Sequence, residues 1–285
     1  MSRPVPGKPP HSAQVLQRWA REWADAEGVP VSRVQRLVSY MVVAAMLDTV
    51  RDARGQPMFL VKGGVAMELR LALRARATQD LDAAFRAAAD EIVERLDDAL
   101  EAGHGDFSAS RTVIEEIGAT RAIRVGVKLA YRGRPWATVP VEIASAEGRS
   151  GEEIERVPAR SLDPLGLDGP AEIACVSLRY QIAQKLHACT QAFEDGAANS
   201  RFRDLIDLLL LRELITKGLM SQVRSACIET FELRATHAWP PTLAIGVGWA
   251  DAYAELAAAL DFQPADVEEA AEAVERFIIE IDRAA

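Results

Sequence analysis

Apolar residues recur at helical spacing towards both ends of the chain, and the pattern differs in between. Residues 12–28 and 31–53 combine helical periodicity with a helix-forming composition. The pattern is helical again after SLDPLGLDGP, over residues 171–194, 200–217, 219–235, 247–260 and 264–283. We therefore expect helices before and after a central region of another kind.

The central region predicts strands. PMFLV (57–61) is a short apolar run that begins at a proline, and GGVAMELRLAL reads as a turn that continues into a helix. Residues 80–86 predict a second strand, followed by a helix that Gly103 closes. From 119 to 145 the apolar period becomes two, with RGRP as a turn. This pattern predicts an antiparallel hairpin with one face in the core and one face open.

These elements predict an α+β fold. We expect a small mixed or antiparallel sheet as the core, with N-terminal helices and a C-terminal helical bundle. A length of 285 residues allows one large domain or two modest ones. We expect a proline-rich disordered tip over residues 1–10, an α/β domain with its helices over 11–165, and a helical domain over 166–285.

Two glycines interrupt the apolar sequence after the first predicted strand. Gly63 and Gly64 have no Cβ, so their backbone N–H groups can approach a ligand closely. A helix that begins there adds a partial positive charge suited to phosphate. A strand–Gly–Gly–helix segment also fits an ordinary tight turn, so the glycines alone do not decide the function.

Two carboxylates stand at the other end of the same helix-length segment. Asp80 and Asp82 lie two residues apart on a predicted strand, so both project from one face, where like charges repel unless a cation lies between them. Mg²⁺ prefers carboxylate oxygens completed by water and substrate phosphate. Glu142, on the polar face of the strand over 137–144, is the candidate third ligand. A solvated strand end is the alternative for the two aspartates.

Together these parts suit nucleotidyl transfer. The helix between the motifs would return the chain to the same sheet edge, where phosphate-holding glycines meet metal-holding aspartates. Metal ions there would hold a triphosphate, lower the pKa of the attacking hydroxyl and stabilise the leaving pyrophosphate. Lys62, Arg76 and Thr78 flank the motifs, and we expect them to contact the triphosphate or support the metal site. A lysine at a strand end is also commonly just solvated.

Several separated pieces of the sequence resemble one family in the right order. VKGG followed by RATQDLD resembles the hGG and DhDh pattern of the DNA polymerase β-like nucleotidyltransferase superfamily. KGG, a helix and R-x-T-x-D-L-D resemble more narrowly the AbiEii/AbiGii abortive-infection toxins, including the MenT toxins. RYQIAQKLHACTQ with RFRDLIDLLLL is similar to that family's later K and RDxxD helices. The family more often has Asp where this chain has Glu142.

The resemblance implies an activity and further site residues. It implies a Mg²⁺-dependent toxin that transfers a nucleotide from a nucleoside triphosphate to RNA, in some members the 3′ end of tRNA, and so blocks translation and growth. It also implies an antitoxin encoded beside the toxin. Lys185 would contact the triphosphate, and Asp207, or else Asp204, would position that lysine or contact nucleotide. The residues alone equally fit a lysine that reaches out to water and two structural salt-bridge acids in a buried helix.

Composition limits the classes further. A net charge of −9 argues against nonspecific coating of DNA, although Arg70, Arg74 and Arg76 leave room for a local basic groove. Three scattered cysteines are too few for a disulfide framework or a zinc cluster. The longest apolar run, around VSYMVVAAML, is too short to cross a bilayer. We expect a cytoplasmic protein with no membrane contact.

Other classes share parts of this pattern. In the aspartate-nucleophile phosphatases a DxD motif directly follows the first strand of a Rossmann-like domain, whereas here a strand–glycine–helix unit precedes DLD. A scaffold that binds nucleotide without catalysis would be expected to lack one of the metal ligands, and both aspartates are present. A nucleotidyltransferase that modifies a protein or a small molecule shares the triphosphate site and stays an open alternative.

Overall fold

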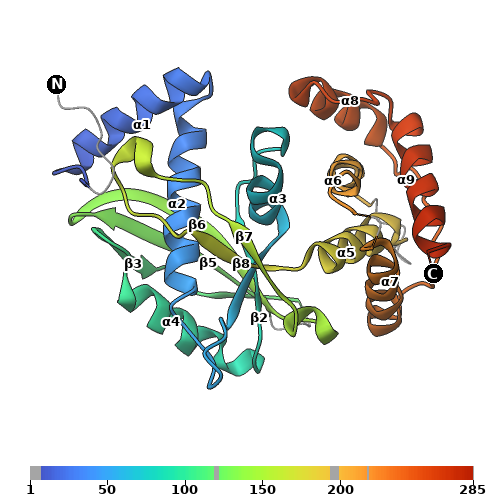
Figure 1. Ribbon diagram of the computed structural model, residues 1–285, viewed down its shortest axis with the longest axis horizontal. Coiled ribbons are helices and arrows are strands. Elements are labelled where there is room, and N and C mark those ends of the chain that lie inside the picture. The colour runs from blue at the N-terminus through green and yellow to red at the C-terminus, as the bar shows by residue number, and fades with distance from the viewer. Residues whose placement is uncertain (1–7, 119–121, 193–198, 217, 285) are drawn as a thin grey trace. The chain divides into compact units, whose positions relative to one another are not determined.

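The computed structural model describes residues 8–118, 122–192, 199–216 and 218–284, and the chain divides into two compact units (Figure 1). The sheet unit comprises Met1–Ala72, Ala77–Ala146 and Gly151–Val176. The helical unit comprises Leu73–Arg76, Glu147–Ser150 and Ser177–Ala285. Within the described residues, no helix is long and apolar enough to cross a membrane.

Two helices open the sheet unit, α1 (Ala13–Glu27) and α2 (Val31–Leu47). The Ser12 hydroxyl caps α1 by accepting from the Val15 N–H, and Gly28 ends the helix in a left-handed conformation. The Tyr131 hydroxyl donates to the Pro10 carbonyl at 2.6 Å, and Pro10 is buried rather than part of a disordered tip. Residues 1–7 of that predicted tip lie outside the described residues.

A mixed sheet forms the centre of this unit. Eight strands in the described residues join it: β1 (Phe59–Lys62), β2 (Leu81–Phe85), β3 (Phe107–Arg111), β4 (Glu115–Ile117), β5 (Ala122–Tyr131), β6 (Arg134–Ser145), β7 (Ile154–Pro158) and β8 (Glu172–Val176). Their order is β3-β5-β6-β2-β1-β8-β7, with β4 also beside β5. Strand β2 lies between antiparallel β1 and parallel β6. The predicted α+β class and mixed sheet are confirmed.

Strand alternation sorts the residues of this sheet onto two faces. On one face Leu81 and Ala83 stand beside Val141 and Ile143 and join the main hydrophobic core with residues of α1, α2 and α4 (Ile92–Ala102). On the other face of the β5–β6 hairpin the Arg124 side chain is exposed. The predicted hairpin, with one face in the core and one face open, is therefore confirmed, although residues 119–121 of its predicted span lie outside the described residues.

The structure adds strands that the sequence pattern did not predict. Strands β3 and β4 line up along β5, and β7 pairs with β8. The helix predicted from residue 171 is wrong at its start, because Glu172–Val176 is a strand and α5 begins only at Leu178. A short, continuously apolar run such as IACV shows neither a helical nor a strand period, because a strand buried on both faces and a buried helix have the same apolar sequence.

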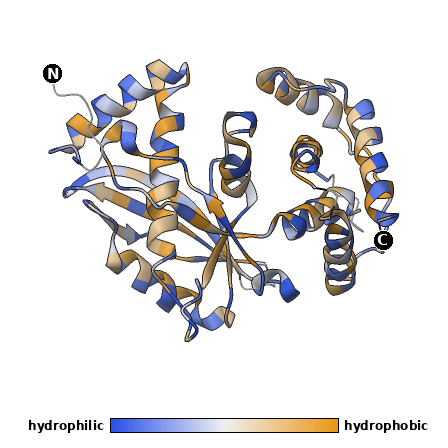
Figure 2. Ribbon diagram, in the orientation of Figure 1, coloured by the Kyte–Doolittle hydropathy of each residue, from blue (hydrophilic) through white to orange (hydrophobic). Residues whose placement is uncertain are grey.

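Helices α5 (Leu178–Thr190), α6 (Arg203–Arg212), α7 (Met220–Arg234), α8 (Trp249–Leu260) and α9 (Val267–Asp282) build the helical unit. Helix α5 packs on α6 and α7, and α9 packs on α6, α7 and α8. Hydrophobic residues dominate α6 (Figure 2), and most of them are buried. The predicted C-terminal helices are present in shortened form, and the predicted ends at 193–194 and 217 lie outside the described residues.

Candidate active site

Strand β1 passes directly into helix α3 (Gly63–Leu71) through the two glycines. Gly63 has a φ of +60°, which L side chains rarely adopt. A Cβ built on Gly63 would lie 1.9 Å from Asp82 Oδ2, and one built on Gly64 would lie 2.5 Å from Thr78 Oγ1. Both positions require glycine, because side chains from the DLD segment occupy the space a Cβ would need. The two motifs therefore meet, as predicted, where β1 ends and β2 begins, among the inner strands of the sheet.

Asp80 is positioned differently from the prediction. It lies at a bend just before β2 begins at Leu81, so the argument that both aspartates project from one strand face does not apply to it. Thr78, 3% exposed, constrains it instead. The Thr78 hydroxyl lies 3.0 Å from Asp80 Oδ1 and 3.3 Å from the Asp80 carbonyl oxygen. A hydrogen bond from a buried neighbour thus fixes the direction of the Asp80 carboxylate.

A row of four charged residues crosses the sheet at Asp82. In the strand register Asp82 is opposite Lys62 of β1 on one side and opposite Glu142 of β6 on the other. Glu142 is in turn opposite Arg124 of β5, and Arg124 Nε lies 2.8 Å from Glu142 Oε1. Register partners project from the same face of a sheet. Two acidic residues therefore stand side by side on one face, with a basic residue at each end of the row.

The chemistry of these carboxylates fits a divalent cation. Mg²⁺ takes hard oxygen ligands and commonly keeps water and substrate phosphate in its remaining positions, so one or two protein carboxylates are enough. In the part of the chain that the structure describes, no three Asp, Glu, His or Cys side chains converge closely enough to hold a metal ion. Because Glu142 is paired with Arg124, Asp80 and Asp82 are the better candidates, and Glu142 as third ligand stays a prediction.

In the helical unit, Lys185 forms a buried ion cluster with both predicted aspartates. Lys185 Nζ lies 2.7 Å from Asp204 Oδ1 and 2.6 Å from Asp207 Oδ2. The three residues are 9%, 2% and 0% exposed, respectively. Burial alone would lower the pKa of the Lys185 ammonium, but the charges of the two carboxylates outweigh it and raise that pKa above its usual value. The interpretation of Lys185 as a lysine that reaches out to water is therefore wrong.

Arg76 belongs to this cluster by its contacts. Its Nε and Nη2 atoms each lie 3.3 Å from Asp207 Oδ2, whereas Asp204 Oδ2 lies 3.9 Å from the exposed Arg201. Asp204 Oδ2 and Asp207 Oδ1 are buried without a hydrogen-bond donor among the described residues, which is costly for a carboxylate. The predicted site residues belong to two units. The helical unit holds Arg76, Lys185, Asp204 and Asp207, and the sheet unit holds Lys62, Gly63, Gly64, Thr78, Asp80, Asp82 and Glu142.

His187 of α5 is buried, with an exposed fraction of 2%. Its Nδ1 lies 3.2 Å from Arg234 Nη1, and its Nε2 lies 2.9 Å from Thr236 Oγ1. Because a guanidinium can only donate, Nδ1 accepts and Nε2 carries the proton. Burial and, next, the charge of Arg234 lower the pKa of His187 to about 4, so the imidazole is neutral at pH 7. Its contacts stabilise the helical unit.

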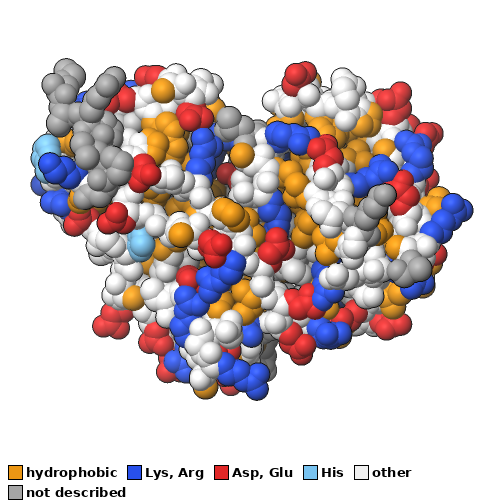
Figure 3. Space-filling view, viewed as in Figure 1, with side chains coloured by type: hydrophobic (Ala, Val, Ile, Leu, Met, Phe, Trp, Pro, Cys, Tyr) orange, Lys and Arg blue, Asp and Glu red, His pale blue; other side chains and the backbone are white. Residues whose placement is uncertain are grey.

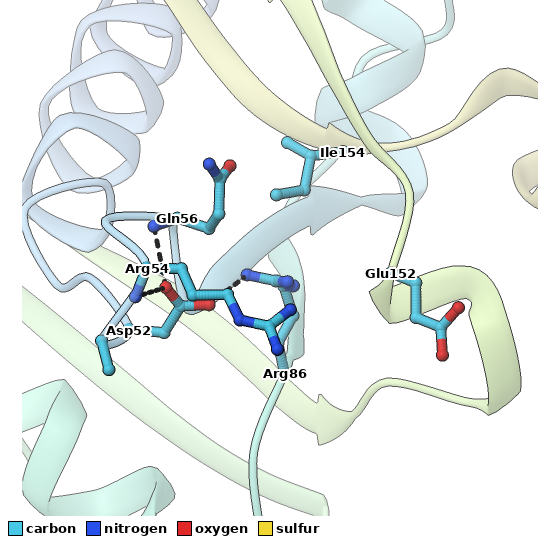
Figure 4. A pocket seen from close by; sticks show the side chains of 7 residues that line it. Asp52, Arg54, Gln56, Arg86, Glu152 and Ile154 are labelled. Carbon is cyan, nitrogen blue, oxygen red and sulfur yellow. Dashed lines mark hydrogen bonds and ion pairs between the residues drawn. The ribbon is translucent and has the colours of Figure 1, made fainter.

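A separate polar pocket of about 350 Å³ lies at the end of β2 away from Asp80 (Figure 4). Arg86, the residue after β2, donates from Nη1 to Asp52 and to the Pro57 carbonyl, and from Nε to the Gly151 carbonyl. Asp52 also accepts from the backbone N–H groups of Gln56 and Arg54, and these contacts lower its pKa. The arrangement holds the turn before β1 and is not part of the candidate site.

Comparisons with known proteins identify the family of the chain. The model of the family described as nucleotidyl transferase AbiEii toxin, type IV toxin–antitoxin system, matches residues 45–278. Among solved structures, the chain resembles MenT4, a nucleotidyltransferase toxin of Mycobacterium tuberculosis, with a TM-score of 0.56 and 18% identity. That match covers 97% of this chain and 91% of MenT4. Among curated proteins no match was found. The family match spans both motifs and the later lysine and aspartate helices, and the chain therefore belongs to the AbiEii family of nucleotidyltransferase toxins.

Proposed function

We propose that this toxin transfers a nucleoside monophosphate from a nucleoside triphosphate to an RNA acceptor. The 3′ end of tRNA is our first choice of acceptor, and the expected consequence is arrest of translation and growth. The observation that carries the proposal is the contact between the two motifs: the Asp82 carboxylate occupies the space that a Cβ on Gly63 would fill. A carboxylate is thereby fixed at the N-terminus of a helix that begins with the two glycines, where a metal–triphosphate complex would bind.

Each residue of the sheet unit has a role in this proposal. Asp80 and Asp82 would hold Mg²⁺, with Glu142 as the third carboxylate. Gly63 and Gly64 would present backbone N–H groups to the phosphates, and Lys62, opposite Asp82 in the register, would offset their negative charge. Thr78 would act through Asp80, whose carboxylate its hydroxyl contacts.

The proposed reaction forms one bond and breaks one. The hydroxyl oxygen of the acceptor bonds to the α-phosphorus, the bond from that phosphorus to the bridging oxygen breaks, pyrophosphate leaves, and the hydroxyl proton passes to solvent. Mg²⁺, when bound, would neutralise the triphosphate and lower the pKa of the attacking hydroxyl. The chain's own contribution is to hold the carboxylates and the helix N-terminus in fixed positions before the substrate arrives.

For the helical unit we propose that Lys185, Asp207 and Asp204 are needed for nucleotide binding, as the resemblance implies. Arg76 is assigned with them because it contacts Asp207. Because the cluster is buried and its charges are paired, its first effect is to fix the position of the Lys185 ammonium. The family implies in addition an antitoxin that counters the toxin.

RNA as the acceptor is not obvious from surface charge. The chain carries a net charge of −9, and acidic and basic side chains are intermixed on the face in Figure 3. The acceptor is therefore best tested directly. We expect purified protein with Mg²⁺, total tRNA and each α-labelled nucleoside triphosphate in turn to label tRNA with at least one nucleotide.

Periodate-oxidised tRNA is the matched control, because oxidation destroys the terminal diol while leaving the rest of the RNA intact. We expect it to take up no label. Label on oxidised tRNA would contradict transfer to the 3′ end. Label that appears only on protein or on a small-molecule fraction would contradict the RNA acceptor and support one of the alternative substrates.

A further inference from the structure

Thr78 is held on three sides, although it lies in a stretch of irregular backbone between α3 and β2. The Tyr40 hydroxyl of α2 donates to the Thr78 carbonyl at 3.0 Å, and the Thr78 N–H donates to Glu68 Oε1 of α3 at 3.0 Å. On the third side Thr78 packs against Gly64, where a Cβ would lie 2.5 Å away. Backbone groups that no helix or strand satisfies therefore find side-chain partners here.

These contacts also affect the orientation of the Asp80 carboxylate. Thr78 is 3% exposed and Tyr40 is 2% exposed, so the hydrogen bond between them is shielded from water, and the bond to the half-buried Glu68 is shielded in part. With its backbone fixed, Thr78 directs its hydroxyl to Asp80 Oδ1 at 3.0 Å. If either anchor were removed, the segment before β2 would gain freedom, and the Asp80 carboxylate would lose its preferred direction. Groups in the second layer of a metal site commonly act in this way.

We propose that Tyr40 and Glu68 are positioning residues that orient Asp80 for metal binding through Thr78. This inference rests on the proposed role of Asp80 as a metal ligand. Tyr40 acts as a permanent donor, because burial and then the charge of Glu68 raise the pKa of its phenol and keep it protonated. Glu68 acts as an acceptor for the Thr78 N–H. Neither residue is expected to touch the substrate.

Tyr40→Phe removes one hydroxyl and keeps the ring, so it tests the donor alone. We expect the affinity for Mn²⁺, titrated calorimetrically without nucleotide, to fall about tenfold, the lower end of what second-layer changes cost. Tyr131→Phe is the matched control in the same unit, since that buried tyrosine also donates to a backbone carbonyl, that of Pro10. We expect Tyr131→Phe to bind Mn²⁺ like the wild type.

Glu68 is tested by a pair of variants. Glu68→Gln keeps a side-chain oxygen that can accept from the Thr78 N–H, whereas Glu68→Ala keeps none. A positioning role predicts that the glutamine variant retains near wild-type Mn²⁺ affinity and that the alanine variant loses about tenfold. In the transfer reaction, the positioning variants should need more Mg²⁺ for half-maximal rate and approach the wild-type rate at saturating Mg²⁺.

The outcomes separate the inference from the proposed function. Wild-type protein that binds Mn²⁺ no better than Asp80→Asn would overturn the metal role of Asp80 and this inference with it. Wild-type protein that binds Mn²⁺, together with Tyr40→Phe and Glu68→Ala that bind it equally well, would overturn the inference alone. Equal losses in Tyr40→Phe and Tyr131→Phe would also overturn it, because they would indicate a general effect of core hydroxyl groups.

Discussion

Replacement of Gly63 by alanine is expected to reduce nucleotidyl transfer roughly a hundredfold or more, because misplacement of a catalytic group by about 1 Å is enough for such a loss. The new Cβ would lie 1.9 Å from Asp82 Oδ2, so the carboxylate must move by more than a small adjustment. A rate measurement with α-labelled nucleoside triphosphate at saturating Mg²⁺ would report the loss.

The matched control for Gly63 is Gly28→Ala. Gly28 has a φ of +67°, close to the +60° of Gly63, but a Cβ there meets nothing within 4 Å. Both substitutions therefore carry a similar backbone penalty of about 1 kcal/mol, and only one displaces a carboxylate. Normal activity in Gly63→Ala, or an equal loss in Gly28→Ala, would show that the contact with Asp82 does not matter for the reaction.

The second large effect concerns stability. Lys185→Met is expected to lower the free energy of unfolding by about 3–5 kcal/mol, the usual cost of leaving a buried charge without its partner. Asp207 would keep Arg76 at 3.3 Å, but Asp204 would keep only a distant contact with Arg201 at 3.9 Å. Urea unfolding followed by circular dichroism would measure the difference.

Two further variants test this explanation. Adding Asp204→Asn to Lys185→Met should restore part of the lost stability, because the unpaired charge is removed. Arg201→Met should cost less than about 1 kcal/mol, since that guanidinium is exposed and lies at the limit of an ion pair. A double variant less stable than Lys185→Met would mean that the cost comes from lost packing rather than from the isolated carboxylate.

Much of the sheet unit could be predicted because its signals are local. Each of three short patterns predicts one element: the glycines after a buried strand, the DLD segment and the alternating hairpin. The contact between Gly63 and Asp82 could also be expected, since a single helix separates the two motifs. Strand β8 could not, because its apolar run is too short to show a period, and it is placed by pairing with β1, more than a hundred residues earlier in the chain.

The partners of the predicted acids were harder to predict. A regular hairpin around the RGRP turn would set Arg124 opposite Val141, but an irregularity between Leu129 and Ala130 shifts the register by one and sets it opposite Glu142. The resulting ion pair is the reason why Glu142 is a weaker metal candidate than the sequence indicated. The phase of the apolar residues is the signal that could have revealed the shift, because Val127 and Val139 face each other in the core only in the shifted register.

Tyr40 and Glu68 were missed for a related reason. Tyr40 lies in a helix whose residues from Val38 to Leu47 are all buried, so it looks like an ordinary core aromatic residue. Glu68 occupies one position of a short helix with mixed composition. Their role appears only when three segments meet at Thr78. By contrast, a cationic partner for Asp204 and Asp207 could be expected in advance, because acids in a nearly all-apolar helix require one, although the sequence left open whether Lys185 or a nearby arginine supplies it.

Nucleotidyl transfer at Asp80 and Asp82 is tested by a comparison of α-labelled with γ-labelled nucleoside triphosphate. Wild-type protein should place the α-phosphate on the acceptor and release the γ-phosphate in pyrophosphate. Asp80→Ala should transfer no α-label to the acceptor and release no labelled pyrophosphate. Asp90→Asn, which changes an exposed aspartate in the same unit, should behave like the wild type. Transfer of the γ-label, or equal α-label with Asp80→Ala, would contradict nucleotidyl transfer at this site.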